Sequence, residues 1–234
     1  MISYIELNGE KSTNVKGLII QSLPPITKPK MRYSSDDIDG RDGDIITKLG
    51  YAAYDKEVSI GLHGDFDIDD AIAFFDSEGE VVFSNEPDKY YRYQILDQID
   101  FERLLRFRTA KVKMHVQPFK YDAVDRTFEA VNNGGMSSIT LRNRGNVVSR
   151  PTVTVYGSGN VELAVNAVTV LSFTIDDGYI TIDADEMNAY HGDALMNRRV
   201  TGDYADLALK AGENVISWKG NVTEIKVEDF SRWV

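Results

Sequence analysis

The sequence of 234 residues contains no cysteine. Disulfide frameworks, thiolate metal sites and cysteine nucleophiles are therefore excluded. A chain of this length can bury a core large enough to fold without such cross-links. The absence of cysteine also fits folding in a reducing cytoplasm.

Histidine is scarce, and the sequence patterns of common active sites are missing. The three histidines, His63, His115 and His191, lack the spacing of zinc-binding helices. Phosphate-binding glycine patterns and the Gly-x-Ser-x-Gly elbow of serine hydrolases are absent as well. The stretch Gly157-Ser158-Gly159 lies between two predicted strands rather than before a helix, so it cannot cradle a phosphate. We therefore expect no catalytic residues, no metal, no cofactor and no enzyme activity.

Positive charge is also in short supply. Lys and Arg number 26 against 37 Asp and Glu, which gives a formal net charge of -11. Binding to nucleic acid or to anionic lipid depends on clustered Lys and Arg, so both classes of partner are disfavoured. The sequence has no apolar run of the roughly 18 residues that a membrane span needs, and the residues Met1–Glu6 lack the features of a signal peptide. We expect no membrane partner.

One acidic stretch, Asp37–Asp44, invites comparison with a calcium-binding loop. An EF-hand loop places oxygen ligands at positions 1, 3 and 5 and a glycine at position 6. Counted from Asp37, position 5 is Arg41, and a cation among the ligands disfavours calcium. We interpret the stretch as a polar turn formed by Asp39, Gly40, Arg41, Asp42 and Gly43.

Strand patterns dominate the rest of the first half. Val58, Ile60 and Leu62 alternate with other residues, and apolar side chains recur at every second position between Ala110 and Val116. A period of two is typical of strands that bury one face. A strand is also expected at Ile45–Tyr51, directly after the acidic turn.

Two short helices are expected among these strands. The first is capped by Asp67, Asp69 or Asp70, and the spacing predicts Ile68, Ile72 and Phe75 on its buried face. The second is expected between Asp100 and Phe107.

Short strands separated by turns fill the second half. A crossing between domains at 122–135 ends in the turn residues Asn132-Asn133-Gly134-Gly135. Strands are then expected at Ser138–Arg142, Thr152–Tyr156, Val161–Val165, Thr169–Ile175, Tyr179–Asp183, Asn214–Trp218 and Glu224–Val227. Such spacing indicates a β-sandwich. We therefore predict an all-β fold with one or two short helices and two sandwich-type domains, residues 1–128 and 129–234.

Three prolines interrupt the chain between Pro24 and Arg32. A central strand does not tolerate this pattern, so the segment is predicted to be an extended arm or an edge segment. Its basic residues are Lys28, Lys30 and Arg32. If the arm reaches onto a neighbouring copy, these cations meet a protein that is otherwise acidic.

Two sets of residues, in this order and spacing, resemble one known family over nearly the whole chain. The first set is Asp39-Gly40-Arg41-Asp42-Gly43, then Gly50-Tyr51, then Pro118-Phe119 with Tyr121. The second set comprises Asn143-Arg144-Gly145-Asn146, the run Pro151–Gly159, Ile180–Asp183, Asn197, Gly202-Asp203-Tyr204, Leu207 and Gly212–Trp218. They are similar to the distal tail proteins of long, non-contractile-tailed bacteriophages, typically those of Gram-positive hosts.

The resemblance implies a structural protein of the virion tail tip that assembles in the host cytoplasm. The first domain would form a homo-hexameric ring. The second, galectin-like or similar to a carbohydrate-binding module, would point outward and in some phages anchor receptor-binding proteins. The ring would join the tail tube protein to the tail-tip hub or tail-associated lysin, and DNA would pass through its channel without specific binding. We assign Lys28, Lys30, Arg32 and Asp39–Gly43 to the ring interface or to a turn.

Three alternatives remain open. The same architecture serves tail-like bacteriocins derived from prophages. A carbohydrate-binding protein for adhesion to the host surface would need exposed, coplanar aromatic rings, for which Tyr179, Tyr190 and Trp218 are the candidates. A hydrolase would need paired carboxylates across a cleft, and Asp185-Glu186 is a pair of adjacent acids with no sign of such an arrangement.

Overall fold

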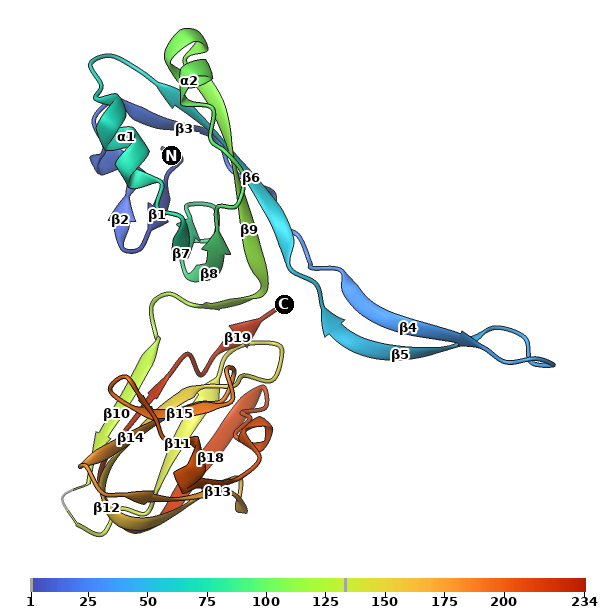
Figure 1. Ribbon diagram of the computed structural model, residues 1–234, viewed down its shortest axis with the longest axis vertical. Helices are drawn as coiled ribbons and strands as arrows, with labels where there is room; N and C mark the ends of the chain where they lie inside the picture. Colours follow the sequence, from blue (N-terminus) through green and yellow to red (C-terminus); the bar gives the residue numbers. More distant parts are fainter. Residues whose placement is uncertain (1, 133) are drawn as a thin grey trace. The chain divides into compact units, whose positions relative to one another are not determined.

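The computed structural model describes residues 2–132 and 134–234 (Figure 1), so Asn133 of the predicted turn lies outside the described residues. The chain divides into two compact units. The first ends at Ala123, and the second spans Val124–Trp233. A division after residue 128 would fall inside strand β10 (Thr127–Val131), which belongs to the second unit. Each unit is described below by itself.

The fold is all-β with two short α-helices, as predicted. In the first unit, antiparallel strands follow the order β2-β1-β7-β8-β9-β6-β3. Their bounds are β1 Ile5–Leu7, β2 Glu10–Lys11, β3 Leu18–Ser22, β6 Tyr54–Leu62, β7 Glu78–Phe83, β8 Lys89–Gln94 and β9 Thr109–Asp122, and a 3-10 turn spans Ser12–Asn14.

The two alternating runs predicted from the sequence pair with each other at the centre of this sheet. Val58 of β6 lies opposite Val112 of β9, and Ile60 lies opposite Ala110. All four side chains are buried. Because cross-strand neighbours on one face pack together, this register joins the two apolar faces into one core.

Helix α1 (Ile68–Phe74) begins at Asp67, whose side chain accepts a hydrogen bond from the Asp69 backbone N–H at 2.9 Å. The predicted buried face is wrong in part. Ala71 and Phe74 are buried, whereas Ile72 is 44% exposed. Phe75 is buried as predicted, so the buried stripe is Ala71, Phe74 and Phe75 at i, i+3, i+4 spacing, and Ile72 lies beside it. Helix α2 (Phe101–Phe107) is capped in the same way by Asp100, which accepts from Arg103 N–H at 2.8 Å.

In the second unit the strand order is β10-β18-β12-β14-β15-β16, with β11 paired to β18 and β13 paired to β12 and β17. The bounds are β11 Ser138–Asn143, β12 Thr152–Val165, β13 Val168–Ile175, β14 Tyr179–Asp183, β15 Asn188–His191, β16 Ala194–Leu195, β17 Val200–Gly202, β18 Gly212–Glu228 and β19 Arg232–Trp233. Short 3-10 turns span Asn197–Arg199 and Tyr204–Asp206.

Two predicted strand breaks are instead bulges within long strands. Residues 157–160 continue β12, and residues 219–221 continue β18. The paired register of the two strands shifts between Tyr156 and Gly157 and again between Ser158 and Glu162. A Cβ on Gly157 would lie 2.1 Å from the Asn221 carbonyl oxygen. Glycine here permits close approach of two backbones rather than ending a strand.

The motif Asn143-Arg144-Gly145-Asn146 organises one end of the second unit. The buried Asn143 amide group donates to the carbonyl oxygens of Val147 at 2.9 Å and Leu209 at 3.0 Å. Its side-chain oxygen accepts from Gly145 N–H at 2.8 Å. A buried amide is stable only when its donors and acceptors are satisfied, and this one closes the 143–147 turn and ties it to the segment at Leu209.

Candidate functional site

Strands β4 (Met31–Asp37) and β5 (Asp44–Tyr51) form a hairpin that is a sheet of its own (Figure 1). Within the described residues they pair only with each other, from Met31 opposite Tyr51 to Asp37 opposite Asp44. Residues 38–43 connect them, and Gly40 and Gly43 adopt positive φ angles of 84° and 78°. The acidic stretch therefore lies in the connection between two strands, where glycine supplies the left-handed backbone that the turn requires.

The hairpin exposes large apolar side chains on both of its faces. Successive side chains in a strand point to opposite faces, so Ile45 and Ile46 of β5 face opposite ways. They are 39% and 57% exposed, and Tyr33 and Leu49 are each 54% exposed. A two-stranded hairpin alone is at best marginally stable in water. Exposed apolar side chains of this size, gathered on one element, are typical of protein interaction surfaces.

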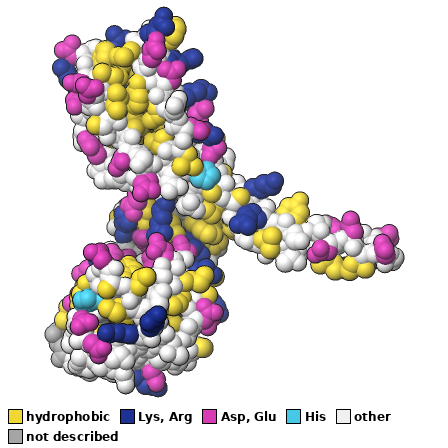
Figure 2. All heavy atoms as spheres, viewed as in Figure 1, with side chains coloured by type: hydrophobic (Ala, Val, Ile, Leu, Met, Phe, Trp, Pro, Cys, Tyr) yellow, Lys and Arg dark blue, Asp and Glu magenta, His cyan; other side chains and the backbone are white. Residues whose placement is uncertain are grey.

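Charge is separated along the hairpin, as Figure 2 shows. Exposed cations lie near its root, at Lys28, Lys30, Arg32 and Lys48. Its tip, defined as Asp36–Asp44, contains five Asp and one Arg. At about 3.3 Å per residue, the two ends are roughly 20 Å apart. The structure thus places the predicted interface residues in two groups, with Lys28, Lys30 and Arg32 at the root and Asp39, Gly40, Arg41, Asp42 and Gly43 at the tip.

The segment that leads into the hairpin is held by three hydrogen bonds within the first unit. Asn85 Nδ2 donates to the Pro24 carbonyl at 3.0 Å, and Lys56 Nζ donates to the Pro25 carbonyl at 3.1 Å. The Ala52 N–H donates to the Lys30 carbonyl at 2.8 Å. The predicted arm is therefore fixed onto the sheet through its prolines, and only the part beyond Lys30 is a hairpin.

Lys56 is buried, with 3% of its surface exposed. Its ammonium group lies 4.8 Å from the centroid of the Tyr91 ring, 5.5 Å from that of Tyr54 and 5.6 Å from that of Phe83. Aromatic faces attract a desolvated cation. Burial nevertheless lowers the pKa of Lys56 to about 8, because the charged form loses water, although the nearby Glu86 opposes the shift.

Glu86 interacts with the polar groups around Lys56. It accepts hydrogen bonds from the Tyr91 hydroxyl at 2.8 Å and from Lys120 Nζ at 2.7 Å. Burial, followed by the hydrogen bond to Glu86, raises the pKa of Tyr91 well above its usual value. Sequence inspection missed this cluster, although Lys56 occupies the same alternating face as Val58 and Ile60.

The lowered pKa of Lys56 predicts how the free energy of unfolding depends on pH. Between pH 8 and 10.5 the folded chain has lost the Lys56 proton that the unfolded chain retains, so this group increases the free energy of unfolding as pH rises. Relative to Lys56→Met, we expect wild-type stability to rise with a slope of at most about 1.4 kcal/mol per pH unit. Urea unfolding of both proteins from pH 7.5 to 9.5 measures the difference. Parallel pH profiles would contradict the prediction.

The three glycan candidates of the second unit do not form one platform. Trp218 is 6% exposed and lies in the hydrophobic core, so its assignment to an exposed platform is corrected. The reason is alternation, because Ile216, two positions earlier, is fully buried on the same face. Tyr190 is half-buried and lines an open depression of about 480 Å³ with Thr152 and Glu228.

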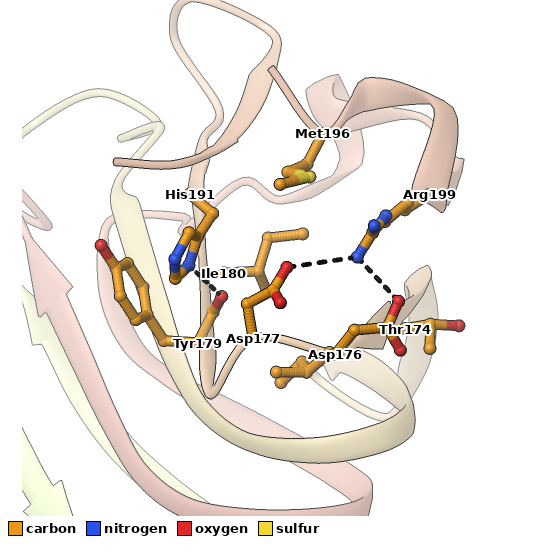
Figure 3. Close-up of a pocket in the computed structure, with 9 residues that line it drawn as sticks. Thr174, Asp176, Asp177, Tyr179, Ile180, His191, Met196 and Arg199 are labelled. Atoms are coloured by element: carbon orange, nitrogen blue, oxygen red, sulfur yellow. Dashed lines mark hydrogen bonds and ion pairs between the residues drawn. The ribbon is translucent and has the colours of Figure 1, made fainter. Parts of the chain in front are cut away.

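Tyr179 is half-buried, and Figure 3 shows its ring beside that of His191. Its centroid lies 5.4 Å from that of Tyr156 and 4.2 Å from that of His191. Near these rings, Arg199 Nη1 forms an ion pair with the Asp176 carboxylate at 2.7 Å. A hollow lined by Tyr179, His191, Asp176 and Arg199 has a volume of only about 10 Å³, which is room for about one water molecule. It is too small for a saccharide.

Within the described residues, no group of three or more His, Asp or Glu side chains is placed to hold a metal ion. His115 is instead paired with Asp55, at 2.8 Å between Nδ1 and the carboxylate. Over the same residues, no helix has the length and apolar character needed to cross a membrane.

Comparison with known proteins identifies the fold. No protein-family model and no curated protein matches the chain. Among solved structures, the chain is similar to the Dit protein of phage SPP1, described as a paradigm of the hub adsorption apparatus in phages that infect Gram-positive bacteria. Sequence identity is 16%, the TM-score is 0.61 and both chains are covered over 100% of their length.

A second similar structure is a chain of the phage P2 baseplate in its activated conformation with calcium. It has 10% identity and a TM-score of 0.54, and the match covers 100% of this chain and 99% of the other. The resemblance to distal tail proteins, drawn from the sequence, is therefore confirmed for the fold over the whole chain.

Proposed function

We propose that this chain is a structural, non-enzymatic protein of the tail tip of a long-tailed phage, where six copies form a ring. The ring joins the tail tube protein to the tail-tip hub or tail-associated lysin, and DNA passes through its channel. The second unit faces outward and anchors baseplate or receptor-binding proteins. The full-length fold likeness to a Dit hub protein and to a baseplate chain supports this role.

The hairpin is the observation that carries the proposal. It has paired strands, yet four large apolar side chains along it are between 39% and 57% exposed. A monomer gains nothing from such a ribbon, because apolar surface in water is unfavourable. A neighbouring copy or another tail protein that covers the ribbon would account for its order.

Identical copies assemble into a ring when each donates one surface and receives another, and the rotation closes. A hairpin that extends from each copy onto the next satisfies this requirement. The net charge of -11 supports a second part of the proposal. Acidic side chains that line the channel would repel DNA from the wall, so that it passes without binding. Replacing channel-facing acids by Lys would then slow DNA ejection.

The native mass of the purified chain tests the ring. We expect light scattering across a concentration series to reveal a species near six times the 26.3 kDa chain. The fraction in that species should grow with concentration, because association follows mass action. A chain that stays monomeric at every concentration would contradict a ring that forms without other tail proteins.

A further inference from the structure

We propose that the acidic hairpin tip of one copy docks on helix α2 of the neighbouring copy. This inference rests on the proposed ring and names the surface that receives the hairpin. It follows from two exposed features of the first unit that carry opposite charge and unpaired apolar side chains.

The tip is a free anionic surface. Within the described residues, Asp36, Asp37, Asp39 and Asp42 are exposed and take part in no ion pair. Ile38 lies among them and is 48% exposed. Five Asp and one Arg give the nine residues Asp36–Asp44 a strong negative charge. Repulsion among these acids falls when the tip meets cations.

Helix α2 offers the complementary surface. Leu104 is its buried anchor, while Leu105 is 42% and Phe107 66% exposed. The guanidinium groups of Arg103 and Arg106 lie 5.9 Å and 6.0 Å from the centroid of the Phe107 ring. The helix therefore presents an exposed aromatic ring flanked by two cations.

The cations of α2 are available to a partner. Arg106 forms an ion pair with Glu102 at 3.4 Å, but both side chains are largely exposed, and such pairs contribute little to stability. Arg108, the residue after the helix, is a third cation at this end of α2, and its guanidinium group is held over the Phe66 ring at 4.4 Å. Arginine suits this role, because its planar group pairs with carboxylates in a bidentate manner.

The proposed contact joins two different copies of the chain. Each chain has one tip and one α2, so each copy donates one hairpin and receives one, which is the condition for a closed ring. Strands of seven and eight residues give the hairpin a reach of roughly 25 Å. Ile38 of the tip and Phe107 of α2 supply apolar contact at the centre, and the Asp–Arg pairs form the rim.

Charge reversal on the full-length chain tests the docking. The variants are Asp39→Lys with Asp42→Lys at the tip, Arg103→Glu with Arg106→Glu on α2, and all four changes together. Light scattering gives the concentration at which the ring is half assembled. We expect each two-residue variant to raise that concentration by about tenfold or more, since like charges then face each other. The four-residue variant should return it to within a few-fold of wild type.

A matched control carries Asp193→Lys and Glu213→Lys, two exposed acids of the second unit, and changes the net charge as much as the tip variant does. It should assemble like wild type. Two outcomes would overturn the docking while the proposed function stands. In the first, the tip and α2 variants assemble at the same concentration as wild type. In the second, both variants assemble more weakly but the four-residue variant does not recover. A wild-type chain that never assembles would overturn the docking and the self-assembling ring together.

Discussion

A chain in which residues 33–49 are replaced by Asn-Gly should fold normally and remain monomeric at every concentration. The replacement joins Arg32 to Gly50, which lie opposite each other in the hairpin, through a two-residue turn that suits antiparallel strands. No residue of the removed stretch belongs to either hydrophobic core. The free energy of unfolding should therefore change by less than about 0.5 kcal/mol, as for surface changes elsewhere.

Light scattering and urea unfolding on the same preparations separate assembly from folding. A milder variant, Ile45→Ser with Ile46→Ser, keeps the ribbon and its charges but removes one exposed apolar side chain from each face. It should assemble more weakly than wild type, since apolar burial drives association. A shortened chain that forms the ring with the wild-type concentration dependence would show that the hairpin is not the assembly element.

Trp218→Ala should be among the most damaging single changes in the second unit. The Trp218 side chain is 6% exposed and lies opposite Leu163 across the β12–β18 pair. Removing a buried tryptophan takes away its transfer free energy and leaves a cavity, with a total loss of about 3–5 kcal/mol. Hydrogen exchange should show amides of β11, β12 and β18 losing protection, while those of β6 and β9 in the first unit keep theirs.

Tyr190→Ala is the matched control, because Tyr190 is half-buried at an open depression. Its effect on amide protection should be clearly smaller than that of Trp218→Ala. Equal losses from the two substitutions would mean that Trp218 does not contribute to the core as its burial implies. Loss of binding to a glycan by Trp218→Ala, with amide protection unchanged, would restore it as a surface residue.

Alternation predicted the centre of the first sheet well, because Val58 and Ile60 mark one buried face of a strand whatever its neighbours are. The same alternation includes Lys56, two positions before Val58 in β6. In β18 it leads from Ile216 to Trp218. Trp218 was nevertheless considered a candidate sugar-stacking ring because of its chemical type, and no burial was predicted for Lys56. In each case the period of the strand was a better guide to burial than the residue type.

Other features depend on contacts that sequence patterns do not encode. Gly157 and its neighbours read as a turn, because glycine is common in both turns and bulges. Only the proximity of the Asn221 carbonyl distinguishes the two. The exposure of Ile45 and Ile46 was equally hidden, since two adjacent apolar residues fit a strand covered on both faces. Among the residues that the structure describes, neither face of the hairpin has such a cover.

The fixed root gives the hairpin a mechanical property. Strand β5 continues into β6 through only Ala52 and Ala53. Strand β6 pairs with β9 from Tyr54 to Gly61 and with β3 from Ser59 to Leu62. On the other side, the chain before β4 is tied through Pro25 to Lys56, which is itself a residue of β6. A force applied at the tip is therefore transmitted to β6 through both strands of the hairpin. Strands under such a load resist by shear, with many ladder hydrogen bonds sharing the force at once, so the hairpin can act as a tether whose strength is that of the central sheet.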